Sequence, residues 1–338
     1  MMDLNIIWFV LITVLFTGFF FLEGFDYGVG TLLPFVSGDD KDRSMIVRAI
    51  GPVWDGNEVW MITAGGALFA AFPHVYATMF STFYLALFLM LLALILRGAA
   101  FELRGKHESL CWRRGWDAAI CFGSAVPAFL WGVAVTNLIQ GLPIDGNMHY
   151  QGTFFDLLTP YTVIGGLTFF LVFLFHGAAF LMLRLSSPAL LLRLQDMAVR
   201  FGRLAVFAFV ICMYYTYART DLFASPPAAA MLIAAAACFV AGLLSMMKKS
   251  YRPAFILGSL AIVCTTVSFF AGLFPRIMVS SLSPEWSLTI YNAASTQNTL
   301  ELMTIAAACL VPVVLIYQGW TYWIFRKRVT EEDLGGHY

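Results

Sequence analysis

Ionisable residues inside long apolar segments are the feature of this 338-residue sequence that most directly indicates chemistry. They are Glu23 and Asp26 near the end of the first apolar segment, Asp55 and Glu58 at the start of the second, and Arg97 within the third. A charge at the bilayer centre costs at least about 2.5–3.5 kcal/mol, so such residues usually face a polar cavity or a partner. Burial also favours the protonated form of a carboxylate, which can then pass the proton on. The group therefore predicts a proton path.

Each of these residues also has a purely structural interpretation. Asp55 and Glu58 would stabilise the N-terminus of a helix through its dipole. Asp26 would form a buried ion pair with Arg97, or Arg97 would extend toward the lipid headgroups. We favour the functional interpretation because the ionisable groups of three successive helices lie at a similar depth in the membrane. If these groups served only the structure, there would be little reason to bury them all at one level.

The elements that position these residues are predicted to be membrane-spanning helices. Apolar residues make up 60% of the sequence and charged residues 12%, about half the charged fraction of a soluble domain. A helix needs about 20 apolar residues to cross the hydrocarbon. The sequence predicts nine continuous spans, at 5–33, 54–72, 76–104, 117–137, 160–185, 201–220, 227–247, 253–275 and 298–325.

Two glycines in the first span have a predicted packing role. Gly24 and Gly28 form a GxxxG pair, which lets a second helix backbone approach closely. The span lacks the basic start and small-residue cleavage site of a secretory signal, and it is too long for one. We therefore expect it to be a true transmembrane helix that carries Glu23 and Asp26 at its far end.

The distribution of Lys and Arg predicts the orientation of the spans. Seventeen of the 20 basic residues fall in alternate connecting segments, at 34–53, 104–116, 184–203, 248–252 and 326–328. Only Arg219 and Arg276 fall on the opposite side. The positive-inside rule then places the N-terminus outside and the C-terminus in the cytoplasm. The acidic groups would face the cytoplasm, 138–159 and 276–297 would be outer loops, and 326–338 would be a cytoplasmic tail.

His176 is the one histidine within a predicted span, and it raises the question of a haem. A low-spin haem needs two axial ligands, and no second histidine lies at the same depth. We predict an interior histidine, with a His/Met-ligated haem as the weaker alternative. The 6 cysteines show no CxxC spacing, so we predict neither a disulfide framework nor a metal site.

Sequence blocks around the ionisable residues are shared with one known family. They are Gly24-Phe25-Asp26-Tyr27-Gly28-Val29-Gly30, Trp54-Asp55-Gly56-Asn57-Glu58-Val59-Trp60, Ile62-Thr63-Ala64-Gly65-Gly66-Ala67-Leu68-Phe69-Ala70-Ala71, Arg97-Gly98, Trp116-Asp117 and Asn292-Ala293-Ala294-Ser295. These blocks resemble subunit II of the cytochrome bd family of quinol oxidases. The resemblance covers nearly the whole chain, and the block that contains Trp54 and Asn57 is highly specific.

The resemblance implies a fold and a role within a complex. The fold would be a single all-α membrane domain, with one four-helix bundle in 1–137, a second in 160–275 and a peripheral ninth helix at 298–325. The complex would oxidise quinol at the outer face and reduce dioxygen to water with protons from the cytoplasm. Two haems b and one haem d would belong to a homologous subunit I. Small single-helix subunits and membrane lipid are further expected partners, nucleic acid is not, and the location would be a bacterial or archaeal cytoplasmic membrane.

The resemblance also assigns roles to single residues. Asp55 matches the aspartate proposed to admit protons, and Asp26 and Arg97 match a buried acid and arginine of the family. Glu58 and His176 stand where some relatives carry Gln, which argues against an essential charge or a haem ligand there. Two other classes stay open: a proton-coupled secondary transporter, whose acids should lie at the midplane on interrupted helices, and a haem-binding cytochrome b subunit.

Overall fold

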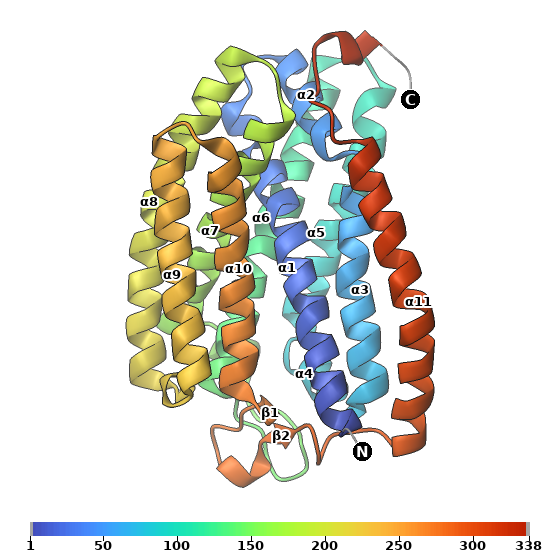
Figure 1. Cartoon of the computed structure of the whole chain (residues 1–338), viewed down its shortest axis with the longest axis vertical. Helices are drawn as coiled ribbons and strands as arrows, with labels where there is room; N and C mark the ends of the chain where they lie inside the picture. Colours follow the sequence, from blue (N-terminus) through green and yellow to red (C-terminus); the bar gives the residue numbers. More distant parts are fainter. Residues whose placement is uncertain (1–2, 336–338) are drawn as a thin grey trace.

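Long, roughly parallel helices form almost the whole of the computed structural model, which describes residues 3–335 (Figure 1). Residues 336–338 of the predicted tail lie outside the described residues. The helices are α1 (Leu4–Val36), α2 (Asp40–Ile50), α3 (Trp54–Ala71), α4 (Pro73–Thr82), α5 (Tyr84–Leu103), α6 (Leu110–Gln140), α7 (Pro160–Arg184), α8 (Pro188–Arg219), α9 (Pro226–Met247), α10 (Tyr251–Leu273) and α11 (Gln297–Ile324).

Eight of these helices are long and apolar enough to cross a membrane. They are α1 and α5 to α11, and most of their surface-facing side chains are apolar. The helix α3 has 18 residues and carries Asp55 and Glu58, and it runs alongside α1 and α11 (Figure 1). The predicted all-helical membrane fold is confirmed, whereas the number of nine spans and their orientation remain predictions.

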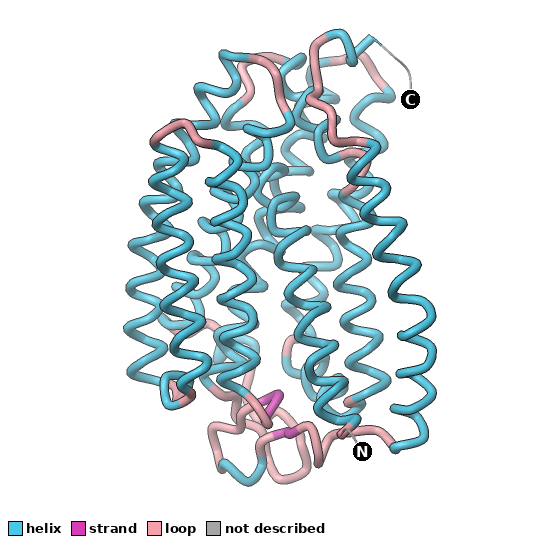
Figure 2. The backbone as a smooth tube through the Cα atoms, in the orientation of Figure 1, coloured by secondary structure: helices cyan, strands magenta, loops and turns pink. Residues whose placement is uncertain are grey.

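The connecting segments separate to two ends of the bundle. The N-terminus and the strands β1 (Arg276–Met278) and β2 (Leu288–Thr289) lie at one end, and α2 and the C-terminal segment lie at the other (Figures 1 and 2). The strands pair antiparallel, with Arg276 opposite Thr289. A bridge between Leu142 and Ser280 joins the two loops that were predicted to lie outside. The basic segments 34–53 and 326–328 lie at the end opposite these loops (Figure 1).

Two local features differ from the sequence prediction. The segment 34–53 was expected to be a loop, but it contains the helix α2, which buries Met45 and Ile46. Eleven residues are too few to register as a span, so hydropathy misses a helix of this length. The predicted span 76–104 is broken at the buried residue Phe83, between α4 and α5. No glycine or proline marks this turn, and packing around Phe83 leaves no trace in a hydropathy pattern.

Glycines bring α1 and α7 into direct backbone contact. A Cβ atom at Gly28 would lie 1.9 Å from the carbonyl oxygen of Phe173, and one at Gly24 would lie 2.6 Å from the ring of that residue. The close approach predicted from the GxxxG pair is therefore confirmed. The contact joins a group formed by α1, α3, α5 and α6 to a second group formed by α7 to α10 (Figure 1). The helix α11 lies at the edge, against α1 and α3.

Candidate functional site

An arginine inside the first helix group is the centre of the candidate site. Arg97 is fully buried on α5, and its Nη1 atom is bonded to Oε1 of Glu23 on α1, which is also fully buried. Oε1 of Glu58 on α3 lies 3.7 Å from the same nitrogen. The guanidinium carbon lies 5.0 Å from the centre of the Tyr27 ring and 5.7 Å from that of Phe101. Because the side chain turns inward, the alternative in which Arg97 extends toward the headgroups is excluded.

Asp26 is the second buried acid, and its partner differs from the predicted one. Asn57 Nδ2 donates a hydrogen bond of 2.7 Å to Asp26 Oδ2, and both side chains are fully buried. The predicted ion pair between Asp26 and Arg97 is wrong, because Arg97 pairs with Glu23 instead. Three residues at 1.5 Å per residue place Asp26 about 4.5 Å beyond Glu23 along α1, beside the first turns of α3.

Two residues of the peripheral helix α11 also reach this site. Tyr322 donates to Asn57 Oδ1 at 2.8 Å, and Gln318 Nε2 donates to the same oxygen at 3.3 Å. The Oε1 atom of Gln318 accepts a hydrogen bond of 2.8 Å from Trp60 Nε1. Sequence reasoning missed all three residues. The available signal was the spacing of Gln318 and Tyr322, which are four apart in an apolar span and so share one helix face.

The exposure of the acids changes step by step along the site. Asp55 lies in the first turn of α3 and is exposed, Glu58 is half-buried one turn further, and Glu23 and Asp26 are fully buried. Trp54, the first residue of α3, packs against Phe101 with ring centres 4.9 Å apart. The structure therefore brings Glu23, Asp26, Asn57, Glu58 and Arg97 together, with Asp55 and Trp54 in the first turn of α3, whereas His176 lies elsewhere, against Phe21 and Phe255. The position of Asp55 is also compatible with the alternative of a helix-dipole contact.

Several polar atoms of the site have no hydrogen-bonding partner among the described residues. They include Glu23 Oε2, Asp26 Oδ1, the hydroxyl of Tyr27 and the Nε and Nη2 atoms of Arg97. A buried polar atom without a partner costs about 1–3 kcal/mol, and most buried polar groups in proteins are satisfied. These atoms are concentrated around Arg97, and bound water would find polar partners there.

The surroundings of His176 engage one of its ring nitrogens and one face of its ring. The ring of this α7 residue is fully buried, and its Nε2 atom lies 3.1 Å from the carbonyl oxygen of Phe21. Because a carbonyl only accepts, Nε2 carries the proton and is not free to bind a metal, whereas Nδ1 has no partner among the described residues. Phe255 covers one ring face, with ring centres 4.9 Å apart and planes 5° apart. Within residues 3–335, no group of His, Cys, Asp and Glu side chains is arranged to hold a metal ion.

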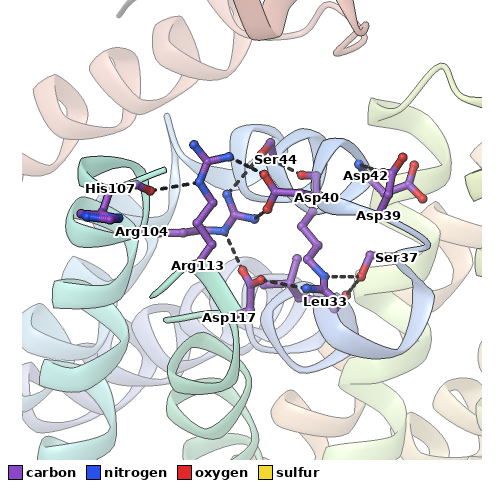
Figure 3. A network of polar contacts seen from close by, with 11 residues as sticks. Leu33, Ser37, Asp39, Asp40, Asp42, Ser44, Arg104, His107, Arg113 and Asp117 are labelled. Atoms are coloured by element: carbon purple, nitrogen blue, oxygen red, sulfur yellow. Dashed lines mark hydrogen bonds and ion pairs between the residues drawn. The ribbon is translucent and has the colours of Figure 1, made fainter. Parts of the chain in front are cut away.

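A second polar cluster, which we call the arginine cap, lies between α2 and the nearby ends of α5 and α6 (Figure 3). Its members are Asp40, Asp117, Ser44, Arg43, Arg104 and Arg113. Arg104 donates to Asp117 Oδ1 at 2.6 Å and to Asp40 Oδ1 at 2.7 Å. Arg113 donates to the other oxygen of Asp40, and Arg43 lies 3.4 Å from that of Asp117. The cap holds α2 across the end of the bundle.

The arginines of the cap determine the protonation of Asp40. Partial burial raises the pKa of this carboxyl, but the hydrogen bond from Arg113 and the charges of Arg104 and Arg113 outweigh burial. The pKa of Asp40 is therefore below its ordinary value, and the group stays ionised around neutral pH. Each carboxylate of the cap thus faces a matching positive charge.

Fold and site together define a multi-pass helical membrane protein with a buried acid cluster that opens at one end of the bundle. Residues 4–325 match the family model described as cytochrome bd terminal oxidase subunit II, and the chain belongs to this family.

The chain is similar to curated relatives along nearly its whole length. It is 40% identical over 342 aligned residues to the cytochrome bd ubiquinol oxidase subunit 2 of Bacillus subtilis, covering 98% of this chain and 99% of the relative. It is 35% identical over 370 residues to the cytochrome bd-I ubiquinol oxidase subunit 2 of Escherichia coli, covering 98% and 96%. A solved chain of the bd oxidase from Geobacillus thermodenitrificans superimposes with a TM-score of 0.73 at 17% identity, over 96% of this chain and all of that one. This last likeness supports the fold.

Proposed function

We propose that this chain is the haem-free subunit II of a quinol oxidase, in which it supports a haem-bearing subunit I and supplies a proton path. Membership of the family and the names of the relatives support the oxidase role. The observation that carries the proton path is the graded series of acids from exposed Asp55 to buried Glu23 and Asp26. A proton path needs such a decrease in solvent exposure, because its entrance must contact water while its interior must exclude bulk water.

The side chains of the series have distinct roles in this proposal. Asp55 takes up a proton at the cytoplasmic end, and Glu58 receives it one helical turn deeper, on the same face of α3. Arg97 lies between Glu58 and Glu23, so its charge keeps at least one of the two carboxylates ionised and able to accept the proton. Asp26, which Asn57 contacts, is the other buried acceptor.

The redox chemistry belongs to the partner in this proposal. Two haems b and one haem d in subunit I would oxidise quinol and reduce dioxygen to water. The chain itself would add two four-helix bundles, in 1–137 and 160–275, with 298–325 as a ninth, peripheral span. Small single-helix subunits and lipid would complete the complex. We propose the cytoplasmic membrane of a bacterium as its location, because the relatives come from bacteria. An archaeal source stays a prediction from the sequence alone.

The arrangement argues against the transporter alternative. Transporter sites lie near the midplane, on helices that are interrupted there. In this chain α1, α3 and α5 are unbroken where they carry the acids and Arg97, and the turn at Phe83 lies 14 residues before Arg97, about 21 Å away at 1.5 Å per residue. The family and its relatives favour the oxidase subunit over both alternatives.

Substitution of the entrance residue in the assembled oxidase tests the proton path. Asp55→Asn is expected to slow quinol oxidation about 10-fold or more, because a positioned proton donor contributes about that much, and to leave the haem absorbance spectrum unchanged. Glu108→Gln is the matched control, since Glu108 is an exposed acid at the same end of the bundle. Oxygen consumption at the wild-type rate in Asp55→Asn would refute the path. Loss of the haem signal would show instead that Asp55 serves assembly.

A second substitution tests the assignment of all haems to subunit I. His176→Gln in the intact complex is expected to retain the full absorbance spectrum, because the histidine is hydrogen-bonded to Phe21 and stacked on Phe255. Disappearance of one haem b band from an otherwise assembled complex would identify His176 as a ligand and reject the assignment.

A further inference from the structure

The peripheral helix α11 is attached to the rest of the chain by polar contacts near its two ends. At the outer end, Trp8 Nε1 donates to Leu300 O at 3.2 Å and to Thr304 Oγ1 at 3.1 Å. Among the described residues of α11, Leu300 is the buried one. At the other end the contacts are those of Gln318 and Tyr322 with Asn57. The second attachment therefore joins a largely exposed helix directly to the buried acid cluster.

The hydrogen bonds at this attachment have a fixed direction. An indole nitrogen only donates, so Trp60 Nε1 requires the oxygen of the Gln318 amide to face it. The nitrogen of that amide then faces Asn57 and donates to Oδ1. With its oxygen committed, the Asn57 amide must turn its nitrogen toward Asp26. The chain of donors that begins at Trp60 therefore ends on the carboxylate.

We propose that Trp60, Gln318 and Tyr322 are positioning residues that lock the Asn57 amide with its N–H facing Asp26. The inference rests on the proposed proton path, in which Asp26 is a buried acceptor. A carboxylate that receives an N–H is stabilised in its ionised form, whereas an amide oxygen in the same place would favour the protonated form. The helix α11 would thereby control whether Asp26 is ready to accept a proton.

The charged and titratable groups around Asp26 come from four helices. They are Glu23 on α1, Glu58 on α3, Arg97 on α5 and Tyr322 on α11. Arg184, at the end of α7, also acts on Tyr322. Glu23, Glu58 and Arg97 keep their contacts when the Asn57 amide turns, so a change caused by the amide alone is measurable against a constant background.

Removal of the two α11 donors tests the lock in the assembled oxidase. Tyr322→Phe is expected to slow turnover about threefold, and Tyr322→Phe combined with Gln318→Leu about tenfold, which are effects of the size of one and two lost hydrogen bonds. Tyr317→Phe is the matched control, because Tyr317 lies on the same helix with an exposed side chain. The control is expected to turn over at the wild-type rate.

An infrared measurement separates the lock from the proton path. The carbonyl band of protonated Asp26 is identified as the one that disappears in Asp26→Asn, and it should gain intensity at neutral pH in the double variant. A stronger band with unchanged turnover would uphold the lock and refute the path through Asp26. An unchanged band would overturn the lock whatever the turnover. If the double variant does not assemble, Tyr322→Phe alone carries the same test with a smaller gain.

Discussion

The two polar clusters near one end of the molecule differ in how completely their charges are matched. In the arginine cap, both oxygens of Asp40 and of Asp117 face arginine nitrogens. In the buried acid cluster, Glu23 and Glu58 share one arginine, and Asp26 faces a neutral amide. One carboxylate oxygen of Glu23 and one of Asp26 have no partner among the described residues.

This difference distinguishes a structural cluster from a site that can change its protonation. Asp40, whose pKa two arginines lower, stays ionised around neutral pH, so it ties helices together and does not carry a proton. A carboxylate with an open oxygen at low dielectric can gain a proton at a modest cost. The more polar cluster is therefore the less reactive one. The candidate site is therefore the cluster whose carboxylates have fewer charged partners, and not the cluster with more charges.

Removal of Arg97 should produce the largest effect, because the acid cluster has no second base among the described residues. Arg97→Met is expected to destabilise the complex by about 3–5 kcal/mol, the cost of leaving a buried charge without its partner. Yield of assembled oxidase and unfolding of the solubilised complex measure this effect. Arg114→Met, at an exposed arginine of the same end, is the control. Normal stability of Arg97→Met would mean that the buried acids are already neutral.

Removal of Arg104 should have a smaller effect, although this residue makes more hydrogen bonds than Arg97. In Arg104→Met, Asp40 keeps Arg113 and Asp117 keeps Arg43. We expect a loss of about 1–3 kcal/mol, typical of broken hydrogen bonds to a charged group. Turnover per assembled complex should stay at the wild-type rate. A turnover defect without a loss of stability would place the cap in the proton path and remove the distinction between the two clusters.

The same two clusters show how far the sequence alone predicts this molecule. Composition and length predicted the helical membrane fold, and the spacing of Gly24 and Gly28 predicted a close helix contact at these glycines, although not that α7 is the partner. The residues of the acid cluster were also predicted, because a charge in an apolar segment is conspicuous. These features depend on local patterns, which a sequence displays directly.

The partners of these residues were not predictable in the same way. Asp26 was assigned to Arg97, but the depth of each residue along its helix brings Asn57 to Asp26 and Glu23 to Arg97. Tyr322 lies 265 residues from Asn57 in the sequence, so only the packing of α11 reveals their contact. The cap was missed because it depends on α2, which is too short to be detected by hydropathy. Pairing is a property of the packed helices and not of any single segment.

Acid conditions should weaken the contribution of the arginine cap to folding stability. The lowered pKa of Asp40 means that this group stabilises the folded state above the ordinary pKa of about 4, and that its contribution is lost as the pH falls through the folded-state value. The thermal unfolding temperature should therefore fall more steeply between pH 5 and pH 3 in the wild type than in Asp40→Asn. The difference should stay below about 1 kcal/mol, because solvent screens a partly exposed pair. Parallel curves for the two proteins would show that Arg104 and Arg113 do not hold Asp40 ionised.

Neutralising Glu58 should have the smallest effect on stability and provides the sharpest comparison within the acid cluster. Its Oε1 atom lies 3.7 Å from Arg97 Nη1, which is too far for a hydrogen bond. Glu58→Gln is therefore expected to change the free energy of unfolding by less than about 0.5 kcal/mol. Glu23→Gln makes the same change of charge at the carboxylate bonded to Arg97, and it should destabilise the complex clearly. Equal losses in the two variants would show that Arg97 is shared evenly, and the series from Asp55 inward would then have no preferred direction.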